Sequence, residues 1–234
     1  MKTMKKVMMA LFIVCACAII APNGIANSNP SEVSAATKKL SKKQQHKLYA
    51  STMKKYAVKV KESVSDPELY GDYDFSRYRV MYVFADIDKN GTDELIMRYR
   101  DPASGKYTGI STGYGENTSI YTIRNGKVRT VKEGSNWSPY CHDYYVRVYK
   151  GSKYIDFGFA HGYLDYAFSK FSKGYLSKKT VYSLTSYVSY ETNKTVYYIN
   201  NKKVSKNAFN KKYNALTNST SKKKNKGYLM KIYK

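Results

Sequence analysis

Apolar positions recur at helical spacing in the part of the chain that follows residue 40. A stripe with a period of three to four residues predicts an amphipathic helix over residues 42–64. Just ahead of it, Ser41-Lys42-Lys43-Gln44 has the spacing of a capping box, in which the Ser and Gln side chains bind the first free backbone groups of a helix. The residues of the stripe and those flanking it are Leu48, Tyr49, Thr52, Met53, Tyr56, Ala57 and Val60.

The pattern then changes to one that is typical of strands. Residues 80–85 form a continuous apolar run, which predicts a buried strand. From residue 95 to 100 apolar side chains alternate with others, so the predicted strand has one face toward the core. We expect Arg98 and Arg100, on the second face, to leave toward solvent.

Short strands with turn signals follow to the end of the chain. Asn125-Gly126 between two of them is a strong hairpin signal. Helical spacing of Phe209, Tyr213 and Leu216 predicts a short helix after Ser205. Further strands are expected at 119–124, 127–131, 144–149, 154–159, 164–169, 182–190, 195–200 and 227–233. The predicted fold class is α+β: an N-terminal helix packed on an antiparallel meander rich in hairpins, with one short helix near the C-terminus.

The beginning of the chain has the pattern of a secretory signal. Basic residues at 1–6 precede an apolar core at 7–21, which is too short to span a membrane. We expect cleavage after Ala35 or Ala36, which divides the chain into a signal peptide (1–35) and a single basic α+β domain (36–234). The predicted location is secreted, either extracellular or associated with the cell wall. A weak lipobox before Cys17 leaves a lipoprotein as an alternative.

Oxygen-bearing side chains occupy every second position between the first two predicted strands. The segment Asp86-Ile87-Asp88-Lys89-Asn90-Gly91-Thr92-Asp93-Glu94 places a glycine after its fifth residue. Ca²⁺ prefers six to eight oxygen ligands, and a tight loop of this kind supplies several of them. The predicted ligands of a structural calcium ion are the side chains of Asp86, Asp88, Asn90 and Glu94 and the carbonyl of Thr92. Asp93 is expected to face water or to bind the loop backbone.

An EF-hand and a plain hairpin turn are the alternative interpretations of this loop. An EF-hand requires a Glu at position twelve, where this chain has Met97, and it requires helices rather than strands on both sides. A plain Asn90-Gly91 hairpin turn with solubilising acids stays open as the alternative. The spacing resembles the strand-flanked calcium loops of FG-GAP and VCBS-type repeats. Together with Tyr197–Phe209, the segment Phe84–Ile96 resembles uncharacterised exported Gram-positive proteins, which implies an extracytoplasmic, calcium-binding protein and transfers no catalytic residue.

Composition adds a strong positive charge and many tyrosines. The chain has 41 Lys and Arg against 17 Asp and Glu, a formal net charge of +24, and 26 Tyr. Such a charge attracts anionic polymers, and interleaved Lys and Tyr suit glycans or cell-envelope polymers. The sequence therefore favours a non-enzymatic binding module for such a partner. The alternative is an extracellular hydrolase whose site the sequence does not identify. Nucleic acid is not favoured as a partner, because no recognition motif accompanies the charge.

Three cysteines and three histidines offer little catalytic chemistry. Only Cys141 remains after signal cleavage, so the mature chain has no internal disulfide. Cys141, His142 and Asp143 are consecutive and cannot form a triad, since neighbours on a strand point to opposite faces. His161 could approach from another strand. His46 lies on the lysine-rich predicted helix, where a surface position is expected. No spacing predicts zinc.

Overall fold

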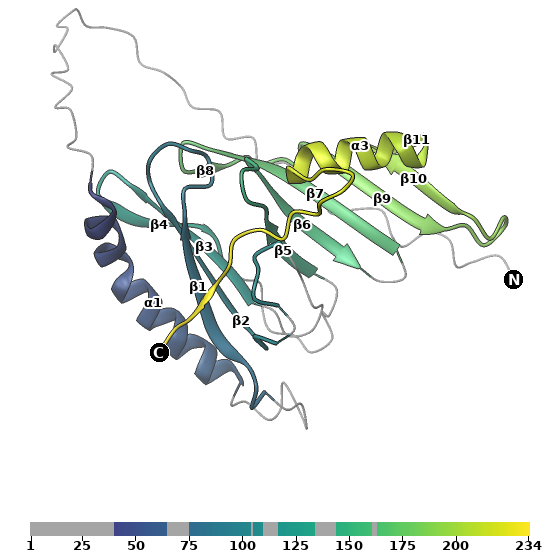
Figure 1. The fold of residues 1–234 in the computed structure, drawn as a ribbon. Helices are drawn as coiled ribbons and strands as arrows, with labels where there is room; N and C mark the ends of the chain where they lie inside the picture. The colour runs from purple at the N-terminus through teal and green to yellow at the C-terminus, as the bar shows by residue number, and fades with distance from the viewer. Residues whose placement is uncertain (1–39, 65–74, 104, 110–116, 134–143, 161–162) are drawn as a thin grey trace, which may run out of the picture. The chain divides into compact units, whose positions relative to one another are not determined.

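A computed structural model describes residues 40–64, 75–103, 105–109, 117–133, 144–160 and 163–234 (Figure 1). These residues belong to one unit, Lys38–Lys234. The chain is rich in antiparallel strands and has two helices in its described part, which confirms the predicted fold class. The elements are α1 (Lys42–Val64), β1 (Arg79–Ala85), β2 (Glu94–Arg100), β3 (Asn117–Arg124), β4 (Lys127–Lys132), β5 (Tyr144–Val148), β6 (Tyr154–Ala160), β7 (Tyr163–Ser172), β8 (Tyr175–Leu176), β9 (Tyr182–Val188), β10 (Thr195–Ile199), β11 (Lys202–Val204), α3 (Lys206–Thr217) and β12 (Lys231–Ile232).

The first helix begins where the capping box predicts. Ser41 N donates to Gln44 Oε1 at 2.9 Å, and Gln44 N donates to Ser41 Oγ at 3.3 Å. These reciprocal bonds satisfy backbone groups that have no partner inside the helix. The stripe of α1 packs on the outer face of the first sheet, through Tyr49, Met53, Tyr56 and Val60 against Leu95, Met97 and Tyr99.

The strands form two antiparallel meanders instead of the single one expected. The first sheet has the order β12-β1-β2-β3-β4, and the second has the order β11-β10-β9-β7-β6-β5, with β8 paired to β7. Asn125 and Gly126 both have positive φ, 52° and 68°, as the predicted hairpin turn between β3 and β4 requires. The closing strand is shorter than expected, because only Lys231 and Ile232 pair with β1.

The two sheets pack face to face around one buried cluster. Ile96 of β2, Ile120 of β3 and Ile155 of β6 are all fully buried in it. The second sheet uses its other face for α3, where Leu184 of β9 meets Phe209 and Leu216 of the helix. Ser205 caps α3, since its side chain accepts a bond from Ala208 N at 3.2 Å. The second helix therefore begins directly after Ser205, as predicted, and its first turn is capped by that residue.

The second face of β2 is not exposed, so the expectation for its arginines was wrong. Arg98 and Arg100 are fully buried, like every residue of β2. Arg98 donates to Thr118 Oγ1 at 2.9 Å, to the Thr108 carbonyl at 2.9 Å and to the Tyr107 carbonyl at 3.2 Å, and it also donates to the carbonyl of Val146 on β5. The alternation predicted the two faces of β2, but in place of water the guanidinium has acceptors on β3, in the segment between β2 and β3, and on β5 of the second sheet.

Candidate functional site

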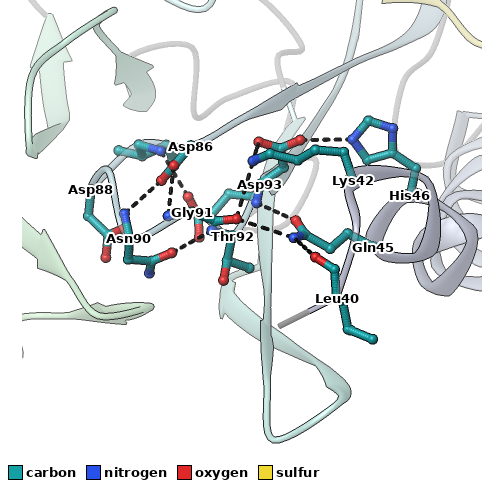
Figure 2. A network of polar contacts seen from close by, with 12 residues as sticks. Leu40, Lys42, Gln45, His46, Asp86, Asp88, Asn90, Gly91, Thr92 and Asp93 are labelled. Carbon is teal, nitrogen blue, oxygen red and sulfur yellow. Dashed lines mark hydrogen bonds and ion pairs between the residues drawn. The ribbon is translucent and has the colours of Figure 1, made fainter. Parts of the chain in front are cut away.

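The predicted metal loop closes the hairpin between β1 and β2. Ala85 pairs with Glu94 at its base. Inside the loop, Asp86 accepts bonds from Asn90 N at 3.0 Å and Gly91 N at 2.8 Å, and Asn90 Oδ1 accepts one from Thr92 N at 2.7 Å (Figure 2). Gly91 has φ 86°, a conformation that glycine adopts without strain. The loop is therefore held by its own oxygen-bearing side chains.

Three carboxylates of this loop meet in a small space. Asp86, Asp88 and Glu94 each offer one oxygen, and these three oxygens lie within 4.8 Å of one another. Asp86 and Asp88 are half-buried and Glu94 is fully buried. Three of the five predicted ligands are thus brought together. Asn90 and Thr92 stay predicted ligands, with the Asn90 side chain already bonded to the backbone of Thr92.

Glu94 is the most perturbed acid of the cluster. Its Oε2 accepts from Ile87 N at 2.9 Å and its Oε1 from Thr122 Oγ1 at 3.0 Å. Burial raises the pKa of the Glu94 carboxyl to about 8, and the nearby carboxylates of Asp88 and Asp86 also raise it. The two hydrogen bonds act in the opposite direction and lower this pKa. Near neutral pH this carboxyl therefore favours a proton or a bound cation over a bare negative charge.

The loop is also bonded to the second sheet. Asp88 Oδ2 accepts a bond from Gly174 N at 3.0 Å, in the turn between β7 and β8. Lys173 and Gly174 in that turn have positive φ, 52° and 73°. A Cβ added at Gly174 would lie 3.2 Å from Thr122 Oγ1, the group that also bonds Glu94. Glycine thus allows the close approach of the β7–β8 turn to the acidic loop.

Asp93 has a different role from the one expected. Its carboxylate lies 2.5 Å from Lys42 Nζ and 2.9 Å from His46 Nε2, so it binds the first turns of α1 instead of facing water (Figure 2). Gln45 Oε1 accepts a bond from Asp93 N at 2.7 Å, and Gln45 Nε2 donates to the Gly91 carbonyl at 3.2 Å. One side of the loop thus binds α1, while Asp86, Asp88 and Glu94 form the metal candidate.

His46 is also not a plain surface residue. Its ring stacks on Phe84 at a centroid distance of 3.8 Å and an angle of 9°. Sequence reasoning also missed Gln45. This residue lies four positions before Tyr49, in line with the apolar stripe of the helix, and it is only 3% exposed. A polar residue in line with such a stripe is a signal that could have indicated a buried polar contact.

A second buried acid lies under α3, away from the acidic loop in sequence. Asp156 of β6 is fully buried, and its Oδ2 lies 3.3 Å from Arg147 Nε. Tyr149 OH lies 3.4 Å from the same oxygen and 3.3 Å from Tyr213 OH of α3. Burial raises the pKa of the Asp156 carboxyl to about 7, although the guanidinium of Arg147 opposes that rise. This cluster joins β5, β6 and α3.

Exposed tyrosines gather on the face of the second sheet that is opposite to α3. The rings of Tyr187 and Tyr198 stack at 5.8 Å and 7°, and their hydroxyls are 3.3 Å apart. Tyr187 is 38% exposed. Tyr198 pairs with Thr185 on one side and Lys203 on the other, and paired residues share a face. The sheet thus presents an aromatic pair next to the ammonium group of Lys203 and next to the Thr185 hydroxyl, which donates to Asp165 Oδ1.

Some candidate residues cannot be placed. Cys141, His142, Asp143 and His161 lie outside the described residues. No described helix combines the length and the apolar character needed to cross a membrane. No protein-family model matches the chain, and neither the curated proteins nor the solved structures gave a significant match.

Proposed function

We propose that this protein is a calcium-stabilised, non-enzymatic binding module that acts outside the cell, on anionic cell-envelope polymers or glycans. The secretory pattern of residues 1–35 supports the location. The net charge of +24 supports an anionic partner. The observation that carries the binding role is the stacked pair of Tyr187 and Tyr198 on the second sheet, in which Tyr187 is 38% exposed.

The calcium part of the proposal is supported by the acidic cluster. Carboxylate oxygens are the preferred ligands of Ca²⁺, and Asp86, Asp88 and Glu94 bring three of them together. Asn90 Oδ1, the Thr92 carbonyl and water would complete the coordination. The donor chemistry fits a hard cation and does not fit zinc, which prefers nitrogen and sulfur ligands. The ion would be structural, since the loop contacts α1 and the β7–β8 turn.

The binding part is supported by the chemistry of the tyrosine face. A sugar ring can lie on an aromatic face, because its C–H groups are apolar while its hydroxyls point outward to polar partners. Lys203 flanks Tyr198 on one side and supplies an ammonium group, while Thr185 on the other side donates its hydroxyl proton to Asp165 Oδ1 and can still accept a bond. Leu184 and Tyr197, which alternate with these residues, face α3. The tyrosine pair is therefore not required for packing the helix, which leaves it available to a ligand.

A sedimentation assay on purified cell wall tests the binding role. We expect the protein to be retained, and salt to weaken its retention, because exposed charges more than about 10 Å apart are screened at 0.1 M ionic strength. The double substitution of Tyr187→Ala and Tyr198→Ala should lower retention at every salt concentration. Tyr175→Ala is the matched control, since this tyrosine is 60% exposed on another strand. Equal losses for the control and the double variant would contradict the assignment to this face.

A further inference from the structure

A second candidate site lies under α1, on the outer face of the first sheet. The cavity has a volume of about 280 Å³, and it is lined by residues of α1, β3 and β4. Among these residues, Tyr56 and Val60 also belong to the helix stripe. The pairing of β3 with β4 shifts in register between Ile120 and Tyr121, next to this cavity. Such a bulge bends a strand locally and often accompanies a functional site.

One residue of the cavity lining has an unsatisfied acceptor. Asn117 is only 7% exposed, and its Oδ1 is buried and accepts no hydrogen bond in the described part of the chain. The backbone carbonyl of the same residue is satisfied, because Tyr56 OH donates to it at 2.6 Å. An unsatisfied buried acceptor costs about 1–3 kcal/mol. A ligand that donates a hydrogen bond at this position would recover that free energy.

Two lysines and one glutamate, Glu133, line the same cavity. Lys55 and Lys59 both line it from α1. Lys59 Nζ lies 2.6 Å from Glu133 Oε1, and both side chains are more than half exposed. Exposed ion pairs of this kind contribute little to stability, so a ligand anion can replace the carboxylate as the partner of Lys59. The hydroxyls of Ser119 and Thr130 add further polar groups to the lining.

We propose that this cavity binds a small polyol phosphate, with the phosphate on Lys55 and Lys59 and a hydroxyl donating to Asn117 Oδ1. Lysine binds phosphate as a compact point charge, and no arginine lines the cavity to favour a bidentate carboxylate. A volume of about 280 Å³ is at the lower limit for drug-sized ligands and suits a ligand of few heavy atoms. The same chemistry occurs in a free polyol phosphate and in a glycerophospholipid headgroup. This site does not involve Tyr187, Tyr198 or the acidic loop.

Titration of the full-length protein with sn-glycerol 3-phosphate, followed by amide NMR shifts, tests the proposal. Shifts should be concentrated at β3, β4 and the facing turns of α1. Lys55→Gln should weaken binding about tenfold, which corresponds to about 1.4 kcal/mol. Lys54→Gln is the matched control, because this neighbour on α1 is exposed and does not line the cavity, and its binding should stay within about twofold.

The orphan acceptor has a test of its own. Asn117→Val suits a strand and removes the unsatisfied oxygen, so the fold should be kept, with a melting temperature that is equal or higher. The substitution should weaken the binding of sn-glycerol 3-phosphate at least about fivefold. It should leave the binding of inorganic phosphate unchanged, since phosphate alone does not need Asn117. If vesicles of phosphatidylglycerol displace the small ligand, the natural ligand is a lipid headgroup. If the vesicles have no effect, the natural ligand is a free or polymer-borne polyol phosphate. Absence of binding up to about 10 mM ligand, or equal effects of Lys54→Gln and Lys55→Gln, would overturn the proposal.

Discussion

Replacing Asp88 with Asn should reverse the sign of its effect on stability when calcium is added. Asp88→Asn removes one negative charge from the acidic cluster. The remaining side-chain oxygen can still accept the bond from Gly174 N, which holds the β7–β8 turn. The substitution gives up the bond of 3.3 Å from Asn90 N to Asp88 Oδ1, but Asn90 N keeps its bond of 3.0 Å to Asp86 Oδ1, so the main change is in the charge of the site.

The magnitude without metal follows from the geometry. Two unit charges 4.8 Å apart repel by about 3.5 kcal/mol at an effective dielectric constant of about 20. Asp86 and Asp88 are half exposed, and water screens them, so about 1 kcal/mol of net repulsion is a reasonable value. In EDTA, Asp88→Asn should thus be as stable as the parent protein or about 1 kcal/mol more stable.

Calcium should favour the parent protein. At a calcium concentration of about 100 times the dissociation constant, a ligand that binds only the folded state adds about 2.7 kcal/mol to the free energy of unfolding. Asp88→Asn loses a charged ligand and should gain only a small part of that. The parent protein should therefore be the less stable of the two in EDTA, or equal, and the more stable of the two in calcium.

Urea unfolding of both proteins in EDTA and in calcium, followed by circular dichroism, measures all four free energies. Asp93→Asn is the control, because this carboxylate of the same loop binds Lys42 and His46 of α1. It should be less stable in both buffers and should keep its response to calcium. The calcium site would be refuted by a parent protein that does not respond to calcium, or by an equal response of Asp88→Asn.

Three further predictions concern the buried polar groups. Arg98→Met should lower the free energy of unfolding by about 3–5 kcal/mol, because it removes the donor to the Val146 carbonyl, the Tyr107 carbonyl and Thr118 Oγ1, while the Thr108 carbonyl keeps its bond from Val148 N; a loss of less than about 1 kcal/mol in urea unfolding would contradict this. Below the pKa that Asp156 has in the unfolded chain, its contribution to stability is fully present, and it is lost as pH rises through about 7. Relative to Asp156→Asn, the parent should therefore lose up to about 1.4 kcal/mol per pH unit between pH 5 and 7, and parallel stability curves for the two proteins would argue against a raised pKa. Gln45→Ala should weaken the attachment of α1 to the loop, which Lys42 and His46 still hold through Asp93, and should speed amide hydrogen exchange at the start of the helix; unchanged protection factors would exclude this.

Local signals predicted those parts of the fold that depend on local chemistry. The Ser41–Gln44 capping box, the Asn125-Gly126 turn and the Ser205 cap all lie where the sequence places them. Each of these depends on residues within four positions of one another. The same holds for the loop, in which Asp86 and Asn90 bind backbone groups only a few residues away.

The errors concern partners that are distant in the sequence. Asp93 was expected to face water or to bind the loop backbone, but residues 47 and 51 positions earlier bind it. Asp88 meets Gly174, which is 86 positions later. The periodicity of β2 correctly separated two faces, yet it could not indicate that a second sheet covers the face with Arg98. A charged residue in an alternating pattern therefore predicts a face of the strand and does not predict what covers that face.

Arg98 has a consequence for how the two sheets can be arranged. Apolar side chains between packed sheets can repack when one sheet slides, with modest losses. The bonds from Arg98 to the carbonyls of Thr108 and Val146 are directional, and sliding by one residue would break them. Arg98 thus selects one alignment of the sheets among several that the apolar residues alone would allow. A chain with Met at this position would still collapse around its core, but its NMR spectrum would show several packings in exchange.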